Sequence, residues 1–143
     1  MTYSLMMMSQ TYNLSIPYWV ILHRKRVEDK RVILNFNQYH TWVPRQRNDY
    51  KQLYTEQLQP FLSQLPQLQH IDRITYIVYY ERNGDSPDTR NITNLIDKFF
   101  CDALVHYNII PDDNHNIILN TMDSWGGVDK VNPRVEITIK GIK

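Results

Sequence analysis

The chain has 143 residues, a formal net charge of +1 and a hydrophobic content of 42%, which predict one soluble globular domain. Its single cysteine, Cys101, excludes an internal disulfide framework and a zinc site built on cysteines. No apolar run approaches the roughly 18 residues of a membrane span, and residues 1–10 lack the basic and apolar regions of a secretory signal. We therefore expect an intracellular, cytoplasmic protein that does not contact a membrane.

Charge is distributed unevenly along the chain. Residues 22–51 contain eight lysines and arginines against three acidic residues, whereas residues 84–125 contain seven aspartates against Arg90 and Lys98. A basic segment can attract phosphate groups, and an acidic cluster can hold a divalent cation. The alternative, that both segments are ordinary solvated faces, stays open at this point.

The first half of the chain predicts a hairpin followed by a helix. Residues 1–14 lack periodicity and are expected to be loosely ordered, which leaves residues 15–143 as the folded domain. Residues 17–23 are β-branched and aromatic and predict a strand, and the alternation over 31–37 predicts its hairpin partner.

A loop and a helix are expected next. The polar and aromatic residues 37–47 predict a loop. Apolar residues at helical spacing predict a helix over 48–62, capped by Asn48 or Asp49 and interrupted near its end by Pro60.

The second half predicts an interior strand and a strongly amphipathic helix. Residues 71–81 form the strongest strand pattern, residues 82–90 have loop composition, and Asn91 is a candidate N-cap for a helix that ends near 106–108. Seven apolar residues of this helix form one stripe.

The remaining residues predict an acidic loop over 109–114, a strand over 116–122, a turn at Gly126-Gly127 and a last strand over 134–140. The expected order is ββαβαββ. It predicts an α+β domain with a mixed sheet of about five strands and two main helices packed mostly on one side.

Carboxylates surround the second helix in the sequence. At about 100° per residue, Asn91, Lys98 and Asp102 share one flank of the apolar stripe, and Asp97 lies about 100° from Lys98, on the side that faces away from the stripe. Lys98 and Asp102 can form a surface ion pair, or Lys98 can stabilise charge on a phosphate. Asp88 before the helix and Asp112 and Asp113 after it meet only if residues 109–114 fold back across the sheet or if the helix is shorter than expected. Carboxylates gathered in this way require a cation, for which Mg²⁺ or Mn²⁺ is suited.

Three features of residues 88–114 form a recognisable pattern. An aspartate precedes an asparagine, Lys98 stands four residues before Asp102-Ala103-Leu104, and Asp112-Asp113 follows about ten residues later. This pattern resembles the RusA-type Holliday-junction resolvase family, in particular its phage and prophage members. Residues 126–139 (GGVDKVNPRVEITI) also resemble the final turn and strand of phage members, and residues 35–42 (NFNQYHTW) match the family more loosely.

The resemblance implies a RusA-like fold and a homodimeric endonuclease that depends on Mg²⁺ or Mn²⁺. Such an enzyme resolves four-way junctions or other branched DNA by phosphodiester hydrolysis, in the cytoplasm of a bacterial host if a phage or prophage encodes it. By the same resemblance, Asp88 and Asp113 are catalytic metal ligands, with Asp112 beside Asp113. Lys98 is the lysine at the phosphate, and Asn91 has a supporting role.

One position departs from the family pattern. Arg90 stands where the pattern has a second aspartate, and either Asp97 or Asn94 is expected to take its place as a metal ligand. We expect the DNA to contact the basic residues Arg24, Lys25, Arg26, Arg45, Arg47, Lys51 and Arg90.

Two other functions stay open from the sequence. Arg90 in place of a carboxylate also fits a DNA-binding protein of the same fold with weakened catalysis. The aromatic residues Tyr39, Trp42 and Trp125 would suit a phage protein whose partner is another protein.

Overall fold

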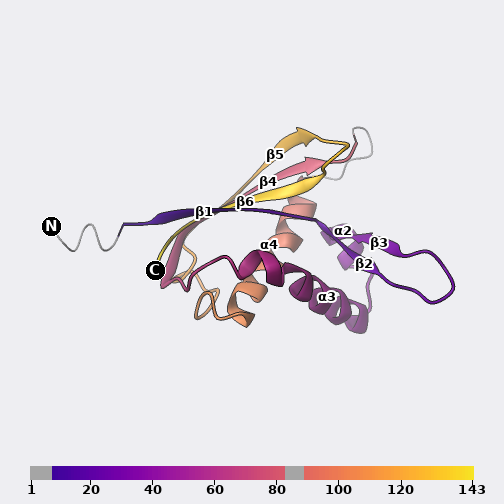
Figure 1. Ribbon diagram of the computed structural model, residues 1–143, viewed down its shortest axis with the longest axis horizontal. Helices are drawn as coiled ribbons and strands as arrows, with labels where there is room; N and C mark the ends of the chain where they lie inside the picture. Colours follow the sequence, from indigo (N-terminus) through magenta and orange to yellow (C-terminus); the bar gives the residue numbers. More distant parts are fainter. Residues whose placement is uncertain (1–7, 83–88) are drawn as a thin grey trace.

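Two β-sheets and two long helices make up most of residues 8–82 and 89–143, which are the residues described by the computed structural model. The larger sheet has the strand order β1-β6-β4-β5, and the smaller sheet is the hairpin β2–β3. The strands are β1 (Gln10–Ile16), β2 (Trp19–Leu22), β3 (Lys30–Ile33), β4 (His70–Tyr80), β5 (Thr121–Val128) and β6 (Arg134–Ile142). Figure 1 shows the helices on one face of the larger sheet and the hairpin at the end of the molecule opposite the C-terminus.

The larger sheet is mixed, which confirms the expected α+β class. β6 pairs antiparallel with both β1 and β4, and β4 pairs parallel with β5. Alternate residues of β4 and β6 are buried beneath the helices, as the two-residue period of a strand requires. They include Tyr76, Val78, Val135, Ile137 and Ile139.

The expectation of a loosely ordered segment over residues 1–14 is wrong for residues 10–14, which belong to β1. Residues 1–7 lie outside the described residues. β1 is an edge strand with one buried face: Leu14 and Ile16 are buried, and the intervening Asn13 and Ser15 are exposed. Because only Leu14 and Ile16 are buried in β1, the alternation that identifies a strand is weak in this part of the sequence.

Helix α3 (Pro44–Leu62) begins four residues earlier than expected. Pro44 occupies the first turn, where a missing N–H is tolerated, and the side-chain oxygen of Gln46 accepts a hydrogen bond from the backbone N–H of Val43 at 3.1 Å. The short helix α2 (Phe36–Tyr39) occupies part of the expected loop over 37–47. Helix α3 ends two residues after Pro60, as expected.

Helix α4 (Thr89–His106) contains the expected apolar stripe, but Asn91 lies within the helix and is not its N-cap. The buried surface is wider than the stripe, since Thr93 and Cys101 are also buried. The helix packs against both the larger sheet and α3, and this explains the width. None of the helices in the described ranges is long and apolar enough to cross a membrane.

Strand β5 begins at Thr121 and not at residue 116, and it includes the glycine pair for which a turn was expected. The register with β4 shifts between Val78 and Tyr79, so that Gly126 is an extra residue in the strand. A Cβ atom at Gly126 would lie 2.8 Å from side-chain atoms of Ile77 and Tyr79. Glycine is therefore required where these two side chains cross β5.

Candidate functional site

A cavity of about 350 Å³ lies between α4, the loop that follows it and the start of β5. Four charged residues line it: Asp97, Lys98, Asp102 and Asp113. Of these, Asp97, Lys98 and Asp113 are site residues expected from the sequence. We call it the carboxylate cavity. An adjoining cavity of about 280 Å³ shares Asp102 and Asp113 with it and is completed by residues that include Lys51. The loop after α4 therefore does fold back toward the helix and brings Asp113 beside α4.

Asp113 carries the electrostatic signature of gathered carboxylates. Its pKa is raised above the ordinary value of a carboxyl group, first by partial desolvation, then by its contact with Asp112 and by the negative charge of Asp102. A neighbouring negative charge disfavours ionisation, and a bound cation would reverse that effect.

Asp112 has a different, local role. Its carboxylate accepts hydrogen bonds from the backbone N–H of Asp113 at 2.7 Å and from the side chain of Asn114 at 2.9 Å. These bonds lower its pKa. Asp112 therefore shapes the loop, whereas Asp113 is the residue that faces both α4 cavities.

Asp97 points toward the sheet, although the helical wheel placed it away from the buried stripe. One carboxylate oxygen, Oδ1, accepts hydrogen bonds from the hydroxyl of Tyr76 on β4 at 2.5 Å and from the thiol of Cys101 at 3.3 Å. Burial, followed by the charge of Asp97, raises the pKa of the Cys101 thiol. Asp97 is thus held in one orientation by two buried donors.

Lys98 and Asp102 do not form the ion pair that their spacing allows. Asp102 pairs instead with Lys51 of α3, with 2.8 Å between Nζ and Oδ2. Lys98 is exposed and has no ion-pair partner within residues 8–82 and 89–143. Its ammonium group is therefore available to a ligand of the carboxylate cavity.

A second polar contact between α4 and β5 was not identified from the sequence. The hydroxyl of the buried Thr93 donates to Asp123 at 2.8 Å. Thr93, Asp97 and Cys101 are spaced four residues apart, so they form one row along the side of α4 that faces β5. That spacing was visible in the sequence, but the position of β5 was not.

The metal site implied by the resemblance is only partly within the described residues. Asp88 lies outside them, and Asn91 lies in the first turn of α4. Across the described ranges, no three His, Cys, Asp or Glu side chains are grouped so that they could hold a metal ion. Asp102 and Asp113 are the carboxylates that share both cavities.

The expected DNA-binding residues fall in two regions. Arg24, Lys25 and Arg26 are exposed in the turn of the β2–β3 hairpin, where Arg24 donates to the carbonyl of Glu28. Arg45 and Arg47 lie in the first turns of α3, close in sequence to Lys51. The guanidinium of Arg47 stacks 4.5 Å from the centre of the Tyr39 ring.

Arg90 is exposed in the first turn of α4, on the helix that carries Lys98. Lys51 differs from the other cations because the ion pair with Asp102 already offsets its charge.

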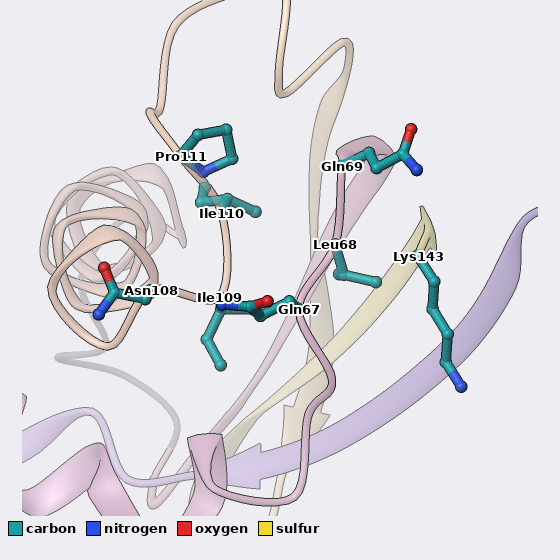
Figure 2. Close-up of a pocket in the computed structure, with 8 residues that line it drawn as sticks. All are labelled: Gln67, Leu68, Gln69, Asn108, Ile109, Ile110, Pro111 and Lys143. Carbon is teal, nitrogen blue, oxygen red and sulfur yellow. The ribbon is translucent and has the colours of Figure 1, made fainter.

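A third cavity, of about 450 Å³, lies where the loop carrying Asp113 meets the start of β4. Figure 2 shows Ile109 beside Gln67, with Lys143 across from Leu68. The backbone N–H of Leu68 donates to the carbonyl of Ile109 at 2.7 Å. This contact anchors the beginning of the loop and so helps to fix the position of Asp113.

Comparison of the chain with protein-family models gave no match, and comparison with curated proteins gave no significant match. The resemblance to RusA-type resolvases therefore stays a prediction from the residues quoted above.

Proposed function

We propose that the protein is a divalent-metal-dependent endonuclease that cuts four-way junctions or other branched DNA. The observation that carries this proposal is the shared position of Asp102 and Asp113 beside Lys98, together with the raised pKa of Asp113. Two carboxylates beside a free ammonium group suit a cation and a phosphate group at the same place.

The donor set fits Mg²⁺ or Mn²⁺. Both ions prefer oxygen ligands, and Mg²⁺ is commonly held by one or two carboxylates, several waters and substrate phosphate. Asp113 and Asp102 would supply the two carboxylates. By the resemblance, Asp88 would add a further ligand. A bound ion would activate water and neutralise charge on the phosphate.

The residues around the carboxylates have separate roles in this proposal. Lys98 would bind a nonbridging oxygen of the scissile phosphate and stabilise the charge that develops there. Lys51 offsets part of the charge of Asp102 through their ion pair. The exposed cations of the β2–β3 turn and of the start of α3 would bind flanking phosphates. In a two-fold homodimer, two such sites would cut opposed strands symmetrically.

The test is cleavage of a labelled four-way junction by the full chain with Mg²⁺ or Mn²⁺. Asp113→Asn should reduce the cleavage rate by about 100-fold or more, since a neutral amide is a poor ligand for a hard cation. Asp49→Asn, an exposed position on α3 outside both α4 cavities, is the matched control and should cut normally. Parental cleavage by Asp113→Asn, or cleavage in EDTA, would reject the proposal.

Junction binding without cleavage is the second candidate function. It is favoured by Arg90 at a position where the family pattern has an aspartate, and by the lack of a three-ligand group among the described residues. Tight binding of the junction in EDTA with no cut at any Mn²⁺ concentration would support this function over the first.

A further inference from the structure

A cavity of about 480 Å³ lies on the flank of α3 opposite the carboxylates, where β3, α2 and the first turns of α3 meet. Gln46 and Tyr50 line this cavity, whereas Lys51 and Thr55 line the cavity on the other flank. Because each residue of a helix is rotated by about 100° from the one before, the mean directions of the two pairs lie about 140° apart around the axis of α3. We call it the amide cavity, after Asn35, Gln38 and Gln46.

Two of the three amides that line the cavity have their oxygen atoms hydrogen-bonded to the backbone. Oδ1 of Asn35 accepts from the backbone N–H of Gln38 at 2.8 Å, and Oε1 of Gln46 accepts from the backbone N–H of Val43 at 3.1 Å. A backbone N–H can only donate, so the oxygen of each amide is fixed in place. The NH₂ groups of Asn35 and Gln46 are left for a ligand.

The charge around the cavity matches these donors. Lys30 lies at its edge and has no ion-pair partner among the described residues, and Arg31 pairs with Glu81 while stacking on Trp19. Not one of the described residues that line the cavity is acidic. A donor-rich, positively charged cavity selects a ligand with hydrogen-bond acceptors and negative charge.

Aromatic rings give the cavity an apolar wall. Trp42 and Tyr50 pack edge to face, with 4.7 Å between ring centres, and both are almost fully buried. The volume lies within the range of small-ligand cavities, roughly 300–1,000 Å³. A nucleotide combines a phosphate, acceptor atoms on the edge of its base and a flat apolar surface.

We propose that the amide cavity binds one unpaired nucleotide of the DNA strand that is cut at the carboxylate cavity. The inference rests on the proposed function for the identity of its ligand. It adds that the protein recognises an unpaired base near the cut, with Asn35 and Gln46 donating to the base or its phosphate and Lys30 binding the phosphate.

The variant Asn35→Asp/Gln46→Glu tests this assignment. Both changes keep the oxygen that accepts from the backbone, and aspartate is as good an N-cap as asparagine. They replace the two NH₂ donors by negative charge. The Kd for a short labelled oligo-dT strand, measured in EDTA by fluorescence anisotropy, should rise by about tenfold or more. Gln59→Glu makes the same change on exposed α3 surface outside the amide cavity and should alter the Kd by less than about twofold.

Thermal unfolding of each variant shows whether it is folded. If the double variant does not fold, Gln38→Glu replaces it, since the exposed side chain of Gln38 makes no recorded hydrogen bond within the described residues. An unchanged Kd in the folded variant would overturn the inference. So would an equal loss in Gln59→Glu, or a parent that does not bind oligo-dT.

The two proposals fail separately, because EDTA removes cleavage from the binding measurement. A parent that binds oligo-dT through the amide cavity but never cuts a junction would reject only the nuclease. A parent that cuts a junction, with a double variant that binds and cuts equally well, would reject only the amide cavity.

Discussion

The two flanks of α3 have opposite chemistry although they are built from neighbouring residues. One flank faces Asp102 and Asp113, where partial desolvation, the contact with Asp112 and the negative charge of Asp102 raise the pKa of Asp113. The other faces amides whose oxygens are already hydrogen-bonded, beside Lys30 and Arg31. In our proposals the first flank binds a cation, and the second binds an anion with acceptor atoms. A nucleic-acid strand with its bound metal ion offers both.

The largest expected effect comes from the core that supports both flanks. Phe99 of α4 is buried and its ring contacts Tyr39 and Tyr54, with centres 6.4 and 6.3 Å apart. Phe99→Ala should lower the free energy of unfolding by about 3–5 kcal/mol, because it leaves a cavity in the core. Urea denaturation measures the loss, and the half-buried Phe61→Ala should lose less. If Phe99→Ala abolished Mn²⁺ binding but left oligo-dT binding intact, Phe99 would not support both flanks of α3.

Tyr76→Phe should weaken ligand binding on one flank of α3 and leave binding on the other flank unchanged. It removes the hydroxyl that donates to Asp97, a loss of about 1.5–3 kcal/mol for a hydrogen bond to a charged group. We expect weaker Mn²⁺ binding with unchanged affinity for oligo-dT in EDTA, measured by titration calorimetry and anisotropy. Tyr12→Phe removes an exposed hydroxyl on β1 and should change neither. An equal loss of both ligands would mean that Tyr76 acts on the fold as a whole.

A smaller effect is expected from Lys51→Met. Its ion pair with Asp102 is partly exposed, so stability should change by less than about 1 kcal/mol. Mn²⁺ should bind more tightly, because Asp102 loses a competing cation. Lys30→Met is the counterpart on the other flank and should weaken oligo-dT binding alone. If Lys51→Met weakens Mn²⁺ binding, the ion pair positions Asp102 for the metal.

The smallest effect is a shift in the pKa of Asp113. Asp102→Asn removes a negative charge that disfavours ionisation, so the pKa of Asp113 should fall toward the ordinary value. NMR titration of the carboxyl carbon without metal measures this shift. Since the raised pKa keeps the proton of Asp113 at higher pH, metal affinity in the parent should fall earlier on acidification than an ordinary carboxyl would predict. Asp49→Asn should leave the titration of Asp113 unchanged.

The sequence predicts those parts of the fold whose pattern is long and regular. The stripe of α4 and the alternation of β6 correctly indicate their elements, because each buries one continuous face. β1 was missed because it is an edge strand in which Leu14 and Ile16 are the buried residues. β5 was misplaced because most of its side chains are exposed and its two glycines are typical of a turn.

The sequence predicts the carboxylate site in part. The position of Asp113 beside α4 follows the expected return of the loop, but the pairing of Asp102 with Lys51 joins two helices and has no local pattern. The burial of Cys101 likewise depends on how β5 lies against α4. The N-cap formed by Asn35 could have been predicted, because asparagine commonly caps a helix by accepting from the backbone N–H three residues later.

The place of β6 in the sheet has a consequence for biosynthesis. β6 (residues 134–142) is made after β1 and β4 but lies between them in the sheet, so β1 and β4 cannot be joined until β6 emerges from the ribosome. A nascent chain halted before residue 134 would therefore expose the apolar faces of β1 and β4 to chaperones.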